Sequence, residues 1–120
     1  DIIINEKMIE NVRHLEPIFM GGLKNFEDLE FIGESRGIGL MGALEMVQDK
    51  KNKLPFDGSI SIGERVANKC IENGLICRPL GPSIVLCPPF ITSEEEMGII
   101  FDTLEKTLKE VFSEVKSLGQ

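Results

Sequence analysis

The chain contains 120 residues, which is enough for one domain with a single hydrophobic core. Its 20 acidic and 13 basic residues give a formal net charge of −7, so no nucleic-acid partner is expected, because the sequence has no basic stripe to neutralise phosphates. No apolar run approaches the roughly 20 residues that a membrane span needs, so no membrane partner is expected either.

Three cysteines and one histidine are the candidate metal ligands or redox groups. Cys70, Cys77 and Cys87 lie in apolar stretches and form no C-x-x-C motif, so we expect reduced thiols in the core of a cytoplasmic protein. A zinc site needs three or four converging ligands, and His14 is not clustered with any of these cysteines. The sequence therefore predicts no metal site, and we expect His14 to be a partly buried surface residue.

The first segment has apolar residues at helical spacing, which predicts an amphipathic helix. These residues are Met8, Val12, Leu15, Phe19 and Leu23. Pro17 lies inside the pattern and removes one backbone donor, so we expect a kink or a break near residues 13–17. Because the chain starts at Asp1 and not at a methionine, we also expect it to be a piece of a longer protein.

A glycine motif follows: the letters G-x-G-x-x-G occur at Gly37, Gly39 and Gly42. This motif indicates dinucleotide binding only where a strand precedes it and a helix follows it within a βαβ unit. The segment before it is short and contains charged residues, and residues 40–48 fit either a strand or one face of a helix. We favour a bent or bulged antiparallel strand pair, with glycines where two backbones approach closely, and a dinucleotide site remains the alternative.

The middle of the chain predicts a loop, a helix and a hairpin. Residues 50–58 are polar and contain three lysines, a proline and a glycine, which is typical of an exposed loop. A helix is predicted from about Ser59 to Asn73, and Gly74 suits the left-handed position that ends a helix. Two short apolar runs joined by the Pro-Leu-Gly-Pro sequence of residues 79–82 then predict a hairpin.

Arg78 is the only charged residue between Ile76 and Phe90. Its guanidinium keeps its proton and can bind a carboxylate through two parallel hydrogen bonds. That carboxylate belongs either to a neighbouring Asp or Glu on the sheet surface or to a ligand, and the residues by themselves leave both possibilities open.

The last helix has a predicted start at Thr92 and Glu95, which match a capping box, and its first turn contains three glutamates that favour the positive end of the helix dipole. Apolar residues then keep helical spacing toward Gly119. The predicted order is α-β-β-α-β-β-α, an α+β fold in which helices cover a small antiparallel or mixed sheet.

Three motifs, in this order, resemble a known family. They are SRGIGLMGALE at residues 35–45, GLICRP at residues 74–79, and IVLCPP at residues 84–89 followed by TSEE at residues 92–95. Together they resemble the C-terminal small domain of class III pyridoxal-phosphate aminotransferases, closest to the ω-amine:pyruvate transaminases. The resemblance covers nearly all of residues 1–120 and implies a fragment of a longer fold-type I enzyme.

The resemblance implies that the full-length parent transfers an amino group from an amine or amino acid to a keto acid such as pyruvate. It implies that pyridoxal 5'-phosphate and the Schiff-base lysine belong to a large domain upstream, so no catalytic or cofactor-binding residue is expected in this segment, which alone should be inactive. The one site residue that it implies here is Arg78, which would bind the substrate carboxylate and swing aside for an apolar group. Arg36 would support a turn, and the parent would be a cytoplasmic homodimer.

Two alternatives stay open. Enzymes of the same fold run decarboxylase or aminomutase chemistry, and only pocket residues upstream could decide among these reactions. The segment could also be a free-standing α+β module that binds a small ligand or another protein, in which case Arg78 would be structural.

Overall fold

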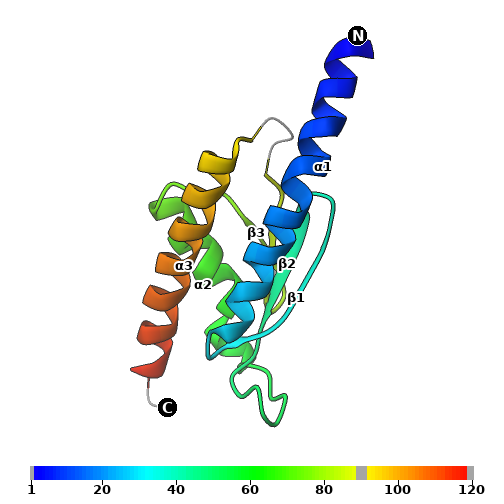
Figure 1. Ribbon diagram of the computed structural model, residues 1–120. Helices are drawn as coiled ribbons and strands as arrows, with labels where there is room; N and C mark the ends of the chain where they lie inside the picture. Colours follow the sequence, from blue (N-terminus) through cyan, green and yellow to red (C-terminus); the bar gives the residue numbers. More distant parts are fainter. Residues whose placement is uncertain (1, 89–91, 119–120) are drawn as a thin grey trace.

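The computed structural model describes residues 2–88 and 92–118, with side chains from Lys7 onward (Figure 1). The predicted order of helices and strands is confirmed, and two short 3-10 turns are added to it. The elements are α1 (Ile2–Asn25), η1 (Phe26–Asp28), β1 (Ile32–Ile38), β2 (Met41–Met46), η2 (Gly58–Ile60), α2 (Ile62–Glu72), β3 (Arg78–Leu80), β4 (Ser83–Leu86) and α3 (Glu94–Lys116). Among the helices of the described residues, none combines the length and the apolar character needed to cross a bilayer.

The four strands form one antiparallel sheet in the order β1-β2-β4-β3. Each outer strand belongs to a tight hairpin, and the two hairpins join where β2 pairs with β4. The β1–β2 ladder is irregular between Ile32 and Glu34, which agrees with the predicted bent or bulged strand pair. The sheet is therefore two local hairpins placed side by side.

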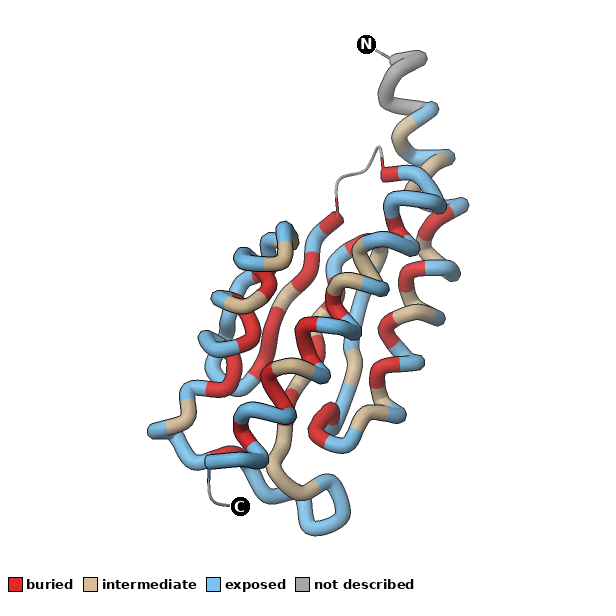
Figure 2. Tube along the Cα trace, turned by 90° about the vertical axis from the view of Figure 1, so that its left-hand side faces the viewer, coloured by how far each residue is buried: buried red, intermediate tan, exposed pale blue. Residues whose placement is uncertain are grey.

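All three helices contribute to the layer that covers one face of this sheet (Figure 1). Helix α1 packs against β1 and β2, α2 packs against β3 and β4, and α3 packs against α1 and α2. Buried residues occur in each of these elements except β3, as the red segments of Figure 2 show, and they form one hydrophobic core. Fully buried examples are Leu15, Phe19, Leu44, Met46, Val66, Ile84, Leu86, Leu104 and Leu108.

Within residues 2–88 and 92–118, no helix covers the other face of the sheet. Directly paired residues of neighbouring strands point to the same face, and Arg36, Ala43, Val85 and Arg78 pair in turn across all four strands. Both arginines are exposed, whereas the next residue along β2, Leu44, is completely buried on the helix side. We call the face that carries this row the open face.

Two glycines let α1 and α2 approach the sheet closely. A Cβ at Gly42 would meet the side chains of Leu23 and Phe19 on α1. A Cβ at Gly63 would meet the backbone carbonyls of Gly81 and Ser83 in the β3–β4 hairpin. The second contact is the tighter constraint, because carbonyl groups fixed in a hairpin cannot move aside as a side chain can.

The glycine motif does not form a dinucleotide site. Gly37 lies in β1, Gly39 lies in the turn with φ +59°, and Gly42 lies in β2, so the motif spans a hairpin and no helix follows it. The Gly39 N–H donates to the Glu16 carboxylate at 3.1 Å, which ties this turn to α1.

Three local predictions were wrong. The break expected near residues 13–17 does not occur: helix α1 runs from Ile2 to Asn25, because the burial of Leu15 and Phe19 on either side of Pro17 outweighs the one backbone hydrogen bond that the proline removes. The capping box at α3 uses Ser93 and Glu96, with donor–acceptor distances of 3.1 and 2.9 Å, and is one residue later than predicted. Helix α2 begins at Ile62 after the η2 turn, because Ser61 adopts a left-handed conformation (φ 51°, ψ 55°) that interrupts the helix.

Candidate functional site

Arg78 is the first residue of β3, an outer strand of the sheet. It pairs with Val85 and is exposed on the open face. Within the described residues its guanidinium has neither an ion pair nor a hydrogen-bond partner. The ion pair with a neighbouring Asp or Glu, one of the two possibilities left by the sequence, is therefore not formed here.

The hairpin that carries Arg78 is held from two sides. Gly81 takes a left-handed conformation (φ +58°) in the two-residue turn, and the Pro82 carbonyl accepts a hydrogen bond from the Met46 N–H at 3.0 Å. On the helix side, the backbone of the turn lies against Gly63 of α2. Arg78 thus extends from a backbone fixed by neighbours, while its side chain is unpaired among the residues that the structure describes.

The neighbours of Arg78 on the open face are mostly apolar. Val85 is its direct partner, and Leu80, two residues along β3, is 68% exposed. The row ends on β1 at Arg36, three strands and roughly 14 Å away. Arg36 does not support the turn as expected: it lies within β1 and pairs with Glu34 at 3.5 Å.

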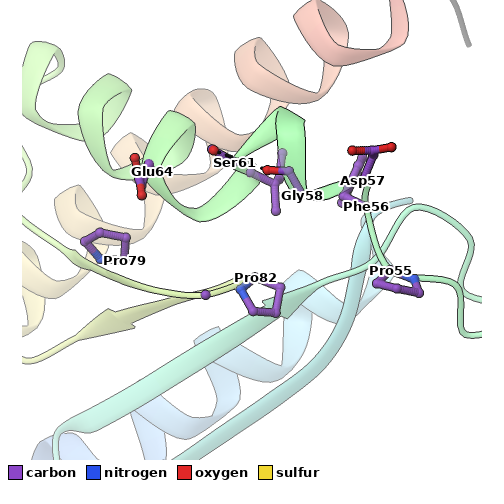
Figure 3. A pocket seen from close by; sticks show the side chains of 10 residues that line it. Pro55, Phe56, Asp57, Gly58, Ser61, Glu64, Pro79 and Pro82 are labelled. Atoms are coloured by element: carbon purple, nitrogen blue, oxygen red, sulfur yellow. Dashed lines mark hydrogen bonds between the residues drawn. The ribbon is translucent and has the colours of Figure 1, made fainter.

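A cleft that the sequence did not predict lies next to the β3–β4 hairpin, with a volume of about 440 Å³ (Figure 3). Pro79 and Pro82 form one wall, and residues 55–58 and the start of α2 form the other. The Asp57 carboxylate, which lines the cleft, accepts hydrogen bonds from the Ser59 N–H (2.9 Å) and the Ser59 hydroxyl (2.8 Å). These hydrogen bonds lower the pKa of Asp57. This cleft therefore has a wall in common with the Arg78 hairpin, and a second carboxylate of its lining, Glu64 on α2, has no hydrogen-bond or ion-pair partner among the described residues. The Pro and Gly residues at 55–58 and 79–82 were the only signal for it.

A larger hollow of about 750 Å³ lies between α1 and the β1–β2 turn. Its lining is almost entirely apolar and includes Ile9, Ile38 and Met41, each more than half exposed, together with Cys87. Cys87 is exposed, so the prediction of three core thiols was wrong for this residue. It follows β4 directly, at the end of the hairpin where the strand leaves the sheet.

The other two cysteines lie in the core, which confirms the prediction for these residues: Cys70 on α2 is completely buried, and Cys77 just before β3 is 6% exposed.

The remaining candidate groups are His14, the possible metal ligands and the lysines. His14 is exposed, not partly buried as expected, and its Nε2 lies 2.7 Å from a Glu94 carboxylate oxygen. No group of three or more metal-ligating side chains occurs in the part of the chain that the structure describes. None of the described lysines is buried: the least exposed, Lys69, keeps 25% of its side-chain surface and contacts Glu114 at 3.6 Å.

The family model and the relatives that match this chain are all described as aminotransferases. A family model described as aminotransferase class-III matches residues 1–108. An uncharacterized aminotransferase of Sinorhizobium fredii is 38% identical over 123 residues, which cover 100% of this chain and 26% of that protein. The adenosylmethionine-8-amino-7-oxononanoate aminotransferase of Methanocaldococcus jannaschii is 36% identical over 110 residues, which cover 92% of this chain and 24% of that protein.

Solved structures agree with the sequence relatives. A crystal structure of an omega-transferase from Vibrio fluvialis is 56% identical with a TM-score of 0.93, and the match covers 98% of this chain and 28% of that chain. The structure of an omega-aminotransferase from Paracoccus denitrificans is 57% identical with a TM-score of 0.91, and the match covers 96% of this chain and 26% of that chain. The chain thus spans about a quarter of the length of the proteins it matches.

Proposed function

The chain belongs to the class III aminotransferase family, and on this premise we propose that it is the small domain of a longer enzyme, in which Arg78 binds the carboxylate of the substrate. The reaction is the transfer of an amino group from an amine or amino acid to a keto acid such as pyruvate. The names of the relatives support this assignment, because they are aminotransferases and transaminases about four times as long as this chain.

Pyridoxal 5'-phosphate is the cofactor that the family implies, and a related structure from Vibrio fluvialis is described as PMP-bound. The cofactor serves as the electron sink and carrier of the amino group. The residues described in this chain do not fit it, because a Schiff base needs a lysine inside a pocket and all lysines described are exposed or half-exposed. We therefore assign cofactor binding to the rest of the longer chain.

The observation that carries the role of Arg78 is its guanidinium, which extends from a fixed hairpin and has no partner within the described part of the chain. A guanidinium keeps its charge at all physiological pH values and presents a planar fork that matches a carboxylate. No described carboxylate competes for it, so an incoming substrate carboxylate meets a free partner. Binding of the keto acid by this fork would hold its carbonyl carbon in one orientation.

The same surroundings explain how a substrate without a carboxylate is accepted. Arg78 has a long aliphatic stem, and its neighbours Val85 and Leu80 on the open face are apolar. The stem can lie along this apolar surface while the charged end turns to water. Arg78 would then leave space for an apolar group of the amine.

The test is Arg78→Ala in the full-length protein, with each half-reaction measured separately. A hydrogen bond to a charged group contributes about 1.5–3 kcal/mol, so the keto acid half-reaction should slow by roughly 10- to 150-fold. The half-reaction with a carboxylate-free amine should change much less. Equal loss in both half-reactions would contradict the role of Arg78.

Arg36→Ala is the matched control. Arg36 has the same charge, is exposed and lies in the same row of the open face, but it is at the opposite edge and pairs with Glu34. Its substitution should leave the difference between the two half-reactions unchanged. The homodimeric state and the cytoplasmic location expected from the sequence stay predictions.

A further inference from the structure

The cleft of about 440 Å³ beside the β3–β4 hairpin has no part in the proposed function. Its walls are largely apolar: Pro79 and Pro82 belong to the hairpin, and Pro55 and Phe56 belong to the segment before α2 (Figure 3). Ligand sites in proteins are typically concave and mostly apolar, with a small number of polar groups that orient the ligand. The cleft therefore has the size and the character of a site for a small organic molecule.

Both walls are held in place before any ligand binds. The Pro82 carbonyl accepts a hydrogen bond from the Met46 N–H at 3.0 Å, which ties the hairpin to β2. On the other side, Phe56 is 9% exposed, and its ring packs edge-on against Phe31 with 5.2 Å between the centroids. Proline rings lose almost no side-chain entropy when a ligand covers them. Little binding energy is therefore spent on ordering the protein.

The charge in the cleft is negative. Among the described residues that line it, Asp57 and Glu64 are charged, and none is a lysine, an arginine or a histidine. Figure 3 shows the two carboxylates at opposite ends of the cleft. Because no cation of the lining balances them, their potential favours a positively charged ligand.

Glu64 is the carboxylate that is available to such a ligand. It is exposed in the first turn of α2, where the positive end of the helix dipole favours its ionised form. It has no partner among the described residues, and the adjacent Arg65 donates from Nε to the Ile60 carbonyl at 2.7 Å instead. Asp57 is partly engaged, because both hydrogen bonds from Ser59 go to its Oδ1.

We propose that this cleft binds an organic ammonium ion, which is a protonated amine attached to a compact apolar group. The ammonium N–H donates to the Glu64 carboxylate, and the apolar group lies against the rings of Pro79 and Pro82. Asp57 adds to the preference for a cation over a neutral molecule of the same shape. An anion is repelled by both carboxylates.

The probe is N,N-dimethylbenzylamine, whose tertiary amine is protonated at neutral pH and carries one N–H donor. It has no transferable amino group, so an aminotransferase does not consume it. The neutral comparison compound is N,N-dimethylbenzamide, which has nearly the same size and shape without the positive charge.

Binding is measured in the full-length protein with a reporter thiol introduced by Gly58→Cys. Gly58 lines the cleft, and a Cβ there meets no atom within 4 Å, so the substitution fits the structure. The rate of reaction with N-ethylmaleimide is read by mass spectrometry on the peptide that contains residue 58, which keeps other cysteines out of the measurement. The probe should slow this rate in a saturable way, and the amide should not.

Glu64→Gln in the reporter protein keeps the size of the side chain and removes its charge. Because exposed ion pairs contribute little, we expect the dissociation constant of the probe to rise by roughly 2- to 5-fold. Glu95→Gln is the matched control, since Glu95 is also an exposed glutamate in the first turn of a helix and does not line the cleft. It should leave the dissociation constant unchanged.

Three results would each overturn the proposal. They are no protection of residue 58 by the ammonium probe, equal protection by the neutral amide, and equal weakening by Glu64→Gln and Glu95→Gln, which would assign the effect to the overall negative charge. None of these readouts uses the amino-transfer reaction or Arg78. A failure of this proposal can therefore be told apart from a failure of the proposed function.

Discussion

Gly63 is the residue at which α2 comes closest to the hairpin that carries Arg78. A methyl group there would meet the Gly81 and Ser83 carbonyls, so Gly63→Ala must push the helix and the hairpin apart. We expect the free energy of unfolding to fall by about 1–3 kcal/mol in urea denaturation. Gly98→Ala is the control: it lies in α3 with no atom near the new methyl group, and we expect a gain of about 0.5–1 kcal/mol from helix propensity. Equal effects of the two substitutions would show that the contact at Gly63 is unimportant.

Glu27 gives a pH-dependent contribution to stability. Its carboxylate accepts hydrogen bonds from the Ser35 hydroxyl (2.5 Å) and the Ser35 N–H (3.1 Å), which lower the pKa of Glu27 below its ordinary value of 4.5. The folded state therefore binds the proton more weakly than the unfolded state does. The resulting stabilisation is complete above the ordinary pKa and is lost as the pH falls through the lowered value.

Ser35→Ala should raise the pKa of Glu27 and lower the free energy of unfolding at neutral pH, with a smaller difference from the unmodified protein well below pH 4.5. Unfolding curves at several pH values measure this. In a Glu27→Gln background the carboxyl group no longer titrates, so the effect of Ser35→Ala should be the same at every pH. A pH dependence that persists in that background would assign it to another group.

At the scale of elements, the capping box of α3 can be tested directly. The Ser93 hydroxyl accepts a hydrogen bond from the Glu96 N–H, so Ser93→Ala leaves one donor of the first turn without its partner. We expect a loss of about 1 kcal/mol in the free energy of unfolding. Ser113→Ala, an exposed substitution within the same helix, should be neutral or slightly stabilising. If both variants unfold at the same urea concentration, the capping box contributes nothing to the free energy of unfolding.

The sequence predicted most elements but not all of their ends. The hairpins, the stop at Gly74 and the apolar stripes depend on local chemistry and were confirmed. The start of α3 was placed one residue early because Thr92-Ser93-Glu94-Glu95-Glu96 matches the capping pattern twice, and only the backbone path into the helix decides between them. The effect of Pro17 on α1 was overestimated, because the packing of Leu15 and Phe19 that keeps this helix continuous is a tertiary interaction.

The candidate site was predictable to a smaller extent. Arg78 stood out in the sequence as the only charge in an apolar hairpin, and its lack of a described partner agrees with that signal. The cleft beside Pro79 was not predicted, because it depends on how α2 lies across the hairpin. Local periodicity carries no information on that arrangement.

The whole molecule has an uneven surface, with an apolar hollow at one end. Ile38 lines this hollow and is 77% exposed, whereas Ile76 is 82% exposed but lies outside it. Contiguous apolar surface binds hydrophobic dyes such as anilinonaphthalene sulfonate. We expect the 120-residue chain to enhance the fluorescence of this dye, Ile38→Ser to reduce the enhancement, and Ile76→Ser to leave it unchanged. Equal reductions would indicate scattered binding and not binding in the hollow.

The order β1-β2-β4-β3 also has a consequence for how the protein folds. The β1–β2 and β3–β4 hairpins close through two-residue turns and can form early, whereas β2 and β4 pair residues roughly 40 positions apart. The joining of the two hairpins is therefore the entropically costly step. The row that ends at Arg78 is complete only after this step, so during synthesis the guanidinium acquires its final neighbours only once β4 has left the ribosome.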